Sequence, residues 1–234
     1  MSRRIVVITG SAGGIGSAIG SRFTKNNDTV IGLDLADGFD LSQTQHCDDA
    51  VRQIIAEHGR IDILCNNAGI SSVGDVVTST LEDWQRVFAV NVFGIANMSR
   101  SVLPHMRHEH SGCIVNTCSI AATVGLVERA VYSASKGAVL ALTKAMAADE
   151  IAHNIRVNCV SPGTVASPWV ERLVATTVDP SQTMEALRKR QPMGRLVECD
   201  EVAEAIFYLA ASSTFTTGAE LLIDGGIAGI RIVQ

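Results

Sequence analysis

A tyrosine and a lysine that could share a proton-transfer site stand four residues apart, Tyr132 and Lys136, in the segment V-Y-S-A-S-K-G. On a helix, residues at i and i+4 lie on one face, so the ammonium can sit beneath the phenol ring. A nearby positive charge favours the phenolate, which makes the tyrosine a usable proton donor and acceptor near neutral pH. Thirteen residues earlier, Ser119 closes the apolar run I-V-N-T-C-S, and its hydroxyl could reach a substrate oxygen that Tyr132 also touches. Such a pair is common on helix surfaces, so its meaning depends on the rest of the chain.

A glycine-rich turn lies between an expected strand at residues 4–9 and an expected helix that runs to about residue 26. The turn reads T-G-S-A-G-G-I-G. Gly10 permits a tight turn, Gly14 lets backbone N–H groups approach a pyrophosphate, and Gly16 allows close packing of helix and strand. A strand, a glycine turn and a helix in this order predict a dinucleotide-binding site, although any strand-to-helix connection can use glycines.

The next expected strand, residues 29–34, ends in Asp34. An acid at this place hydrogen-bonds the adenosine ribose and repels a 2′-phosphate, which favours NAD over NADP. The alternative is an ordinary loop carboxylate.

Only five residues, 35–39, separate Asp34 from Asp40-Leu41-Ser42. A parallel crossover needs a dozen residues or more, so no full helix fits between them. We therefore expect a truncated third strand and an open adenine side of the sheet.

The remaining pattern alternates strands and helices, which predicts one doubly wound α/β domain of six to seven parallel strands over residues 1–234. The strand expected at 61–65 ends in the polar segment Asn66-Asn67-Ala68-Gly69. Such sheets bind ligands at the carboxyl ends of their strands. A long helix over 81–110 carries Asn91 among apolar neighbours, and its amide could satisfy backbone groups at a kink. Residues 164–195, helical from 169 to 190 with a turn at Asp179-Pro180, are expected to form a substrate lid. Further helices are expected at 43–58 and 199–211, and strands at 154–163 and 220–226.

Composition narrows the class of protein. Hydrophobic residues make up 47% of the chain and charged residues 18%, and the net charge of −5 offers no basic surface for nucleic acid. No apolar run approaches the ~18 residues that span a bilayer, and the first residues lack a signal-peptide pattern. Six scattered cysteines contain no C-x-x-C, and the histidines at 105, 108 and 110 have no partner at ligand spacing. We expect a soluble cytoplasmic protein without a metal site.

Together these motifs resemble the short-chain dehydrogenase/reductase family over essentially the whole chain. T-G-S-A-G-G-I-G, N-N-A-G, the serine, Y-x-x-x-K, the P-G loop and the terminal D-G-G occur in the family's order and spacing. The resemblance implies a seven-stranded Rossmann sheet, a nicotinamide cofactor and a homotetramer built on two long helices. The short stretch after Asp34 departs from the family pattern.

The resemblance also implies a role for each matching residue. Tyr132 would be the acid/base, Lys136 its phenolate-stabilising and ribose-binding partner, Ser119 the holder of the substrate oxygen, and Asn91 the anchor of a proton-relaying water. The implied cofactor-binding residues are Gly10, Ser11, Gly14, Ile15, Gly16, Asp34, Leu35, Asp40, Leu41, Asn67, Ala68, Gly69, Tyr132, Lys136, Val165 and Ser167.

Three further segments, V-E-R-A-V-Y, P-G-T-V-A-S-P-W-V-E-R and K-R-Q-P-M-G-R, resemble a subgroup of hydroxy-acid and sugar-acid dehydrogenases. In that subgroup, arginines at these positions bind the substrate carboxylate, which implies Arg129, Arg172 and Arg190 here. Guanidinium forks suit carboxylates, although lid arginines are often only solvated charge.

The sequence therefore predicts an NAD-dependent oxidoreductase that interconverts a secondary alcohol and a ketone on a small, anionic hydroxy acid or sugar acid. One alternative is a 3-oxoacyl-carrier-protein reductase, which usually prefers NADPH and is disfavoured by Asp34. Another, from a different class, is a non-catalytic NAD-binding protein.

Overall fold

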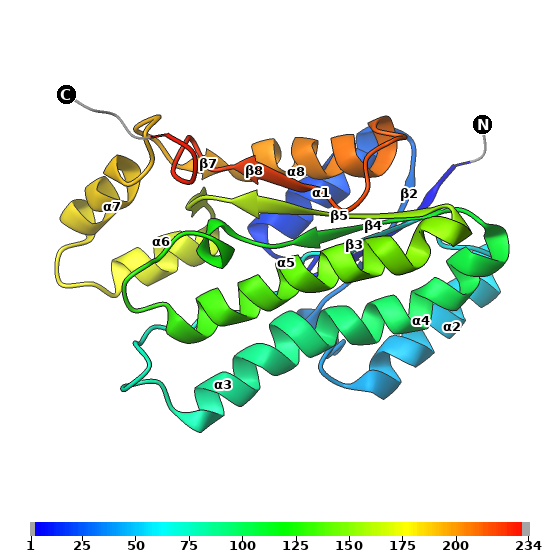
Figure 1. Ribbon diagram of the computed structural model, residues 1–234, viewed down its shortest axis with the longest axis horizontal. Coiled ribbons are helices and arrows are strands. Elements are labelled where there is room, and N and C mark those ends of the chain that lie inside the picture. Colours follow the sequence, from blue (N-terminus) through cyan, green and yellow to red (C-terminus); the bar gives the residue numbers. More distant parts are fainter. Residues whose placement is uncertain (1–2, 231–234) are drawn as a thin grey trace.

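The central element is a parallel six-stranded sheet in the order β2-β1-β3-β4-β5-β8. The computed structural model describes residues 3–230; residues 1–2 and 231–234 lie outside the described part. The predicted doubly wound α/β fold is confirmed (Figure 1). The strands are β1 (Ile5–Thr9), β2 (Thr29–Leu33), β3 (Ile63–Asn66), β4 (Gly112–Thr117), β5 (Ile155–Pro162) and β8 (Glu220–Ile223).

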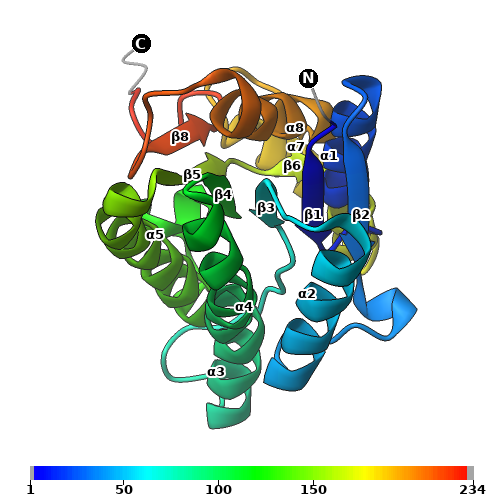
Figure 2. The same ribbon diagram turned by 90° about the vertical axis from the view of Figure 1, so that its right-hand side faces the viewer.

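Helices cover both faces of the sheet, as the long apolar strands require. The helices are α1 (Gly14–Lys25), α2 (Thr44–His58), α3 (Leu81–Phe88), α4 (Gly94–Glu109), α5 (Ala130–Glu150), α6 (Pro168–Ala175), α7 (Pro180–Lys189) and α8 (Cys199–Phe207). α1 and α8 pack on one face, and α2, α4 and α5 on the other (Figure 2). Alternate residues of β1 enter the two cores, because successive side chains of a strand point to opposite faces. Among the described residues no helix is both long and apolar enough to cross a membrane.

The direction of the chain across the sheet reverses at β1. β2 pairs with one edge of β1 and β3 with the other. Ligands of doubly wound sheets bind outside the carboxyl ends of the strands at such a reversal. The glycine turn leaves β1 at this point.

The sheet ends at β2, because the segment after it forms no further strand in the described structure. Leu35–Asp37 makes a single 3₁₀ turn, and the chain reaches α2 at Thr44. The seven-stranded sheet implied by the family resemblance is therefore wrong for this chain. The reason is the one the sequence indicated: too few residues remain for a crossover and a strand.

The predicted helix over 81–110 is confirmed, with one local change. α3 and α4 are joined by a π-helical turn at Ala89–Phe93, which holds Asn91. A capping box between Thr80 and Asp83 fixes the start of α3. π-turns of this kind often occur at functional sites.

The segment between β5 and α8 projects at one end of the molecule, on the left of Figure 1. The short strands β6 (Val165–Ala166) and β7 (Val197–Glu198) pair in parallel and bring the two ends of the segment together. α6 and α7 lie between them, each with a proline at its first turn. The predicted turn at Asp179-Pro180 is where α7 begins.

Candidate active site

Two adjoining cavities lie at the carboxyl ends of β1, β3 and β4. One, of about 370 Å³, is bordered by the glycine turn, and we call it the glycine-loop cavity. The other, of about 260 Å³, contains Tyr132, and we call it the tyrosine cavity. They form one continuous site because they share the lining residues Ile15, Asn67, Gly69, Ile70 and Ser167.

The glycine turn has the geometry that a diphosphate requires. Gly10 has φ +67°, and a Cβ there would lie 2.8 Å from the Cα of Ala68. A Cβ on Gly16 would lie 2.0 Å from the carbonyl oxygen of Gly10. α1 begins at Gly14 with no side chain capping its first N–H groups and no acid in its first turn. These free N–H groups and the positive end of the helix fit the phosphates of a dinucleotide.

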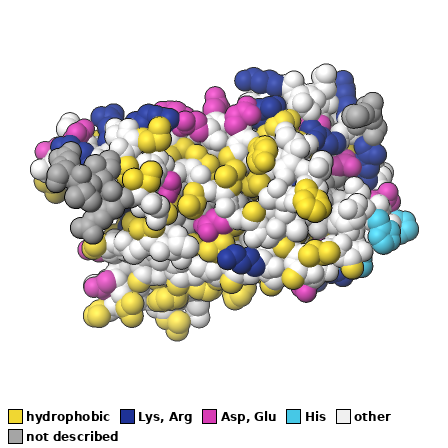
Figure 3. Space-filling view, turned by 45° about the horizontal axis from the view of Figure 1, so that its top comes forward, with side chains coloured by type: hydrophobic (Ala, Val, Ile, Leu, Met, Phe, Trp, Pro, Cys, Tyr) yellow, Lys and Arg dark blue, Asp and Glu magenta, His cyan; other side chains and the backbone are white. Residues whose placement is uncertain are grey.

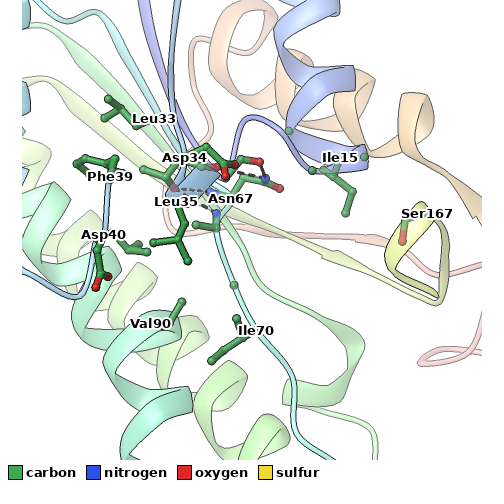
Figure 4. A pocket seen from close by; sticks show the side chains of 18 residues that line it. Ile15, Leu33, Asp34, Leu35, Phe39, Asp40, Asn67, Ile70, Val90 and Ser167 are labelled. Carbon is green, nitrogen blue, oxygen red and sulfur yellow. Dashed lines mark hydrogen bonds between the residues drawn. The ribbon is translucent and has the colours of Figure 1, made fainter. Parts of the chain in front are cut away.

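Asp34 lies beside the glycine turn at the end of β2 (Figure 4). Its Oδ2 accepts a hydrogen bond from the N–H of Ala12 at 2.9 Å, and its Oδ1 accepts one from the N–H of Ala36 at 3.0 Å. The carboxylate is thereby held in place while its remaining lone pairs stay available to a ribose. No lysine or arginine is among the described residues that line the glycine-loop cavity.

One end of this cavity, where we expected the adenine, is formed by the short segment after the 3₁₀ turn. Phe39 and Asp40 lie there, and Ser167 lies at the opposite end (Figure 4). Both the N–H and the hydroxyl of Ser42 donate to Oδ1 of Asp40, which lowers the pKa of that carboxyl. Leu35 is 72% exposed, so this end is open, as the truncation predicted.

Asn67 joins the glycine turn to the neighbouring strands. Its Nδ2 donates to the carbonyl oxygens of Thr9 and Gly10, and its Oδ1 accepts from the hydroxyl of Thr117. The Thr9 hydroxyl in turn accepts from the N–H groups of Asn67 and Ala68. Thr9 and Thr117 were not predicted as site residues. Thr9 was already the last residue of an expected strand, whereas the strand that contains Thr117 was expected to continue to Ser119 and ends at Thr117 in the structure.

Tyr132 and Lys136 lie on one face of α5, as their spacing predicted. Lys136 is only 4% exposed; its Nζ lies 5.8 Å from the centre of the Tyr132 ring and donates to the carbonyl oxygen of Thr117 at 2.8 Å. Ser119 lines the same cavity, and its Oγ accepts from the N–H of Ala121. Its hydroxyl proton is left to donate to a substrate oxygen. The structure therefore brings all three groups to one cavity.

Asn91 is fully buried and fixes the loop after β3 to α5. Its Oδ1 accepts from the N–H of Ile70 at 2.8 Å, and its Nδ2 donates to the carbonyl oxygen of Ile70 and to Oγ of Ser135. Asn91 therefore fulfils one of its two expected roles, because its amide forms hydrogen bonds with backbone groups. Gly69 lies between Asn91 and the site: a Cβ on it would be 3.3 Å from Oδ1 of Asn91 and 3.5 Å from Nζ of Lys136.

The three candidate arginines are not equivalent. Arg129, next to the start of α5, and Arg190, at the end of α7, both line the tyrosine cavity. Burial and then the charge of Arg190 lower the pKa of Arg129. Arg172 is exposed on α6 and lines neither cavity. Within residues 3–230, no carboxylate pairs with any of the three.

Of the residues implied for cofactor binding, all but one line the joined cavities. The exception is Ser11, whose hydroxyl instead packs against β2. A Cβ on Gly32 of that strand would lie 2.5 Å from Oγ of Ser11.

Comparison with known proteins gives the family. The family model described as "Enoyl-(Acyl carrier protein) reductase" matches residues 10–228. "Dehydrogenase/reductase SDR family member 6" of Danio rerio is 36% identical over 95% of this chain and 96% of its own. The chain belongs to the short-chain dehydrogenase/reductase family. It is therefore an oxidoreductase of this family.

Two further proteins are similar to this chain over nearly its whole length. L-fucose dehydrogenase of Mus musculus is 34% identical over 96% of this chain and 88% of its own. The ligand-free structure of Thermoplasma acidophilum aldohexose dehydrogenase superposes with a TM-score of 0.93 at 30% identity, covering 99% of this chain and 96% of that one. Both of these proteins are named as dehydrogenases of sugars.

Proposed function

We propose that the protein is an NAD-dependent dehydrogenase that interconverts a secondary alcohol and a ketone on a small hydroxy acid or sugar acid. One observation carries this proposal: Tyr132, Lys136 and Ser119 line a cavity that opens directly into the glycine-loop cavity. A proton-transfer group thus stands beside a site suited to a dinucleotide.

The residues of the glycine-loop cavity fit the cofactor part by part. The N–H groups at the start of α1 would bind the diphosphate, and Asp34 the adenosine ribose. The negative charge of Asp34, with no cation lining the cavity in the described chain, supports NAD rather than NADP. Lys136 and Tyr132 would bind the second ribose, and Val165 and Ser167 the nicotinamide end.

In the oxidative direction, the Tyr132 phenolate removes the hydroxyl proton of the substrate. When bound, the nicotinamide would accept the hydride that leaves the substrate carbon. Lys136 stabilises the phenolate by its buried charge, and Ser119 donates a hydrogen bond to the substrate oxygen. The main task of the site is to hold these groups in line with the reacting carbon.

Replacement of the acid/base residue tests the proposal. Tyr132→Phe removes only the hydroxyl, so we expect kcat with NAD to fall by about 100-fold or more. The chain offers a matched control, because Tyr208 is 52% exposed and lines neither cavity. Oxidation of hydroxy acids, aldonic acids and neutral alcohols is followed at the absorbance of NADH. Equal activity of Tyr132→Phe and Tyr208→Phe would contradict the catalytic role and support a non-catalytic NAD-binding protein.

A second candidate, a 3-oxoacyl-carrier-protein reductase, is favoured by a relative of that name from Thermotoga maritima, which is 34% identical over 96% of this chain and 97% of its own. That activity usually uses NADPH. A kcat/KM with NADPH well above that with NADH, measured on an acetoacetyl thioester, would select this candidate.

Three further parts of the proposal concern the whole chain. We propose a single domain in which residues 164–195 act as a lid, because Trp169, Leu187 and Arg190 of this segment line the tyrosine cavity. We propose a homotetramer, supported by the exposed Phe93 on the long helices. We propose a cytoplasmic location, which suits the six free cysteines.

A further inference from the structure

The outer edge of β2 is open, which the family resemblance did not imply. A third strand would pair with β2 on the side away from β1, but in the described chain β2 pairs with β1 alone. Figure 2 shows β2 at the margin of the sheet opposite β8, with no described strand beyond it. An unpaired strand edge is a template for pairing with another chain.

The backbone groups of β2 alternate in direction. Its ladder to β1 begins with the N–H of Thr29 and ends with the carbonyl oxygen of Leu33. Residues 29, 31 and 33 therefore bond to β1, and the N–H and C=O groups of Val30 and Gly32 point away from it. Within residues 3–230, no second strand lies beside β2 to bond to these outward groups.

The sequence of β2 carries none of the features that usually protect an edge strand. Such strands are protected by charged side chains, proline or a bulge. The segment T-V-I-G-L has no charged residue and no proline, and its register with β1 runs without a bulge. Leu35, just after the strand, is 72% exposed, so the apolar surface continues past the end of β2.

We propose that β2 pairs antiparallel with β2 of a second copy of this chain, so that the two sheets become one continuous sheet. The twofold axis passes beside Ile31, which faces its own counterpart, and Val30 of each copy faces Gly32 of the other. This inference deepens the proposed homotetramer by naming one of its contacts.

A second copy fits this edge because the edge is complementary to itself. In an antiparallel hydrogen-bonded pair, the two facing residues exchange both of their N–H···O bonds. With Val30 facing Gly32 on each side of the axis, every outward N–H of these residues meets an outward carbonyl oxygen. Twofold contacts of this kind are the commonest in homo-oligomers.

The charges at the two ends of β2 are also complementary. Lys25, in the last turn of α1, lies before the strand, and Asp37 of the 3₁₀ turn lies after it. Both are exposed, and within residues 3–230 neither forms an ion pair. Antiparallel pairing brings the start of one β2 to the end of the other, so Lys25 of each copy lies at the same end as Asp37 of the other. A peptide from another protein could bond to the edge, but a second copy also matches these charges.

The two acids that flank β2 directly do not oppose the contact. Asp28 is bound by Nε and Nη2 of Arg4 at 2.8 and 2.7 Å, and its side chain is 4% exposed. Asp34 accepts hydrogen bonds from the N–H groups of Ala12 and Ala36. Both carboxylates are therefore held against their own chain.

The first experiment removes one outward donor. Val30→Pro deletes the outward N–H of residue 30 and leaves the bonds to β1 in place, because proline is tolerated where the N–H of an edge strand faces solvent. Val30→Thr keeps the N–H and is the matched control. Gly32 is not replaced, because a Cβ there would lie 2.5 Å from Oγ of Ser11.

Light scattering after size exclusion measures the result. We expect Val30→Pro to have half the mass of the wild type and of Val30→Thr, with an unchanged circular dichroism spectrum. A folded Val30→Pro protein of unchanged mass would overturn the edge contact and leave the proposed tetramer and reaction intact. A wild type that is monomeric would overturn the contact and the tetramer together.

The second experiment does not depend on the folding of the proline variant. In a non-hydrogen-bonded antiparallel pair the Cα atoms lie about 4.5 Å apart, within the range of about 4.4–6.8 Å that a disulfide spans. Ile31→Cys faces its own counterpart, so oxidised glutathione should link two chains, each disulfide forming as one glutathione disulfide is reduced. Val30→Cys faces Gly32 and should link at least about tenfold more slowly.

Non-reducing electrophoresis follows the linkage, with the wild type as the control for the native cysteines. No covalent dimer of Ile31→Cys, or equal rates for Ile31→Cys and Val30→Cys, would overturn the proposed register.

The third experiment exchanges the charges at the ends of the strand. Lys25→Glu and Asp37→Lys should each raise the dissociation constant of the assembly by about threefold, because exposed ion pairs contribute little individually. The double variant restores opposite charges and should recover the wild-type value. Sedimentation at a series of concentrations measures the constants; a double variant that is weaker than both single variants would contradict the antiparallel orientation.

Discussion

At the scale of single residues, the burial of Lys136 separates this tyrosine–lysine pair from a pair on a helix surface. A lysine charge removed from water costs several kcal/mol unless partners replace the water. Within the described part of the chain, Nζ of Lys136 makes one hydrogen bond, to the carbonyl oxygen of Thr117, and lies 5.8 Å from the centre of the Tyr132 ring. Its ammonium therefore has donors left for a ribose or for the phenolate, which is what the proposed role needs.

Asp34 gives a prediction at this scale. Asp34→Ala should raise KM for NAD by about tenfold and narrow the preference for NAD over NADP, because it removes both a ribose acceptor and a negative charge. Steady-state kinetics with each cofactor measure the ratio.

Two variants control this experiment. Asp37→Ala changes an exposed acid of the same 3₁₀ turn that lines neither cavity, so it should leave the ratio unchanged. Asp34→Asn separates the charge from the contact with Ala12. An unaltered NAD/NADP ratio in both Asp34 variants would refute the assignment.

At the scale of elements, an ion pair between Arg195 and Glu201 holds the start of α8. Arg195 donates to both carboxylate oxygens of Glu201, each at 2.7 Å, and the N–H of Glu198 donates to Oε2. Arg195 thereby lowers the pKa of Glu201 from 4.5 to about 2. Cys199, the first residue of α8, lies beside Gly14 of the glycine turn. A Cβ on Gly14 would lie 3.1 Å from Sγ of Cys199.

This ion pair predicts a pH dependence of stability. Because the folded pKa of Glu201 is below its unfolded value, its stabilisation is fully present above about pH 4.5 and is lost as the pH falls through about 2. The difference in free energy of unfolding between the wild type and Glu201→Gln should therefore shrink between about pH 5 and pH 2, as measured by urea titration.

Ionic strength provides the control for this measurement. The pair is exposed, so high salt should reduce the difference at pH 7. A difference that is independent of both pH and salt would show that Glu201 acts through packing alone.

Helices and strands were also the elements that the sequence predicted best, because hydrophobic periodicity is a local property. The structure places the long helix at residues 81–109 where 81–110 was expected. The π-turn at Ala89–Phe93 was not predicted. It depends on Asn91 reaching the backbone of Ile70, which belongs to another segment of the chain.

At the scale of the whole molecule, large apolar side chains are exposed on more than one side. Hydrophobic groups gather on the face that carries β8 and α8, with charged groups mostly toward its upper edge (Figure 3). Leu222 of β8 and Tyr208 after α8 are 43% and 52% exposed, and Phe93 on the opposite layer is 58% exposed. Apolar side chains that gather on an exposed face are typical of association sites.

The proposed homotetramer predicts the mass of the protein in solution. We expect light scattering after size exclusion to give four times the mass of the chain. Phe93→Asp should reduce the assembly, because a charge cannot be buried between apolar helices without a partner. Val178→Asp, at a fully exposed site in the lid turn, should leave it unchanged. A wild-type protein that elutes as a monomer would contradict the tetramer.

The sequence by itself determined the order of elements, the glycine turn, the tyrosine–lysine pair and the loss of a strand after Asp34. Each of these depends on spacing along the chain. It named Arg129, Arg172 and Arg190 alike, and only the tertiary structure separated them. Val170 and Val174 of α6 are buried, 6% and 5% exposed, and their packing fixes the rotation of that helix, which turns Arg172 to the outside. Whether a side chain points into a cavity depends on such contacts between segments that are distant in the sequence. The spacing of residues along one segment does not determine these contacts.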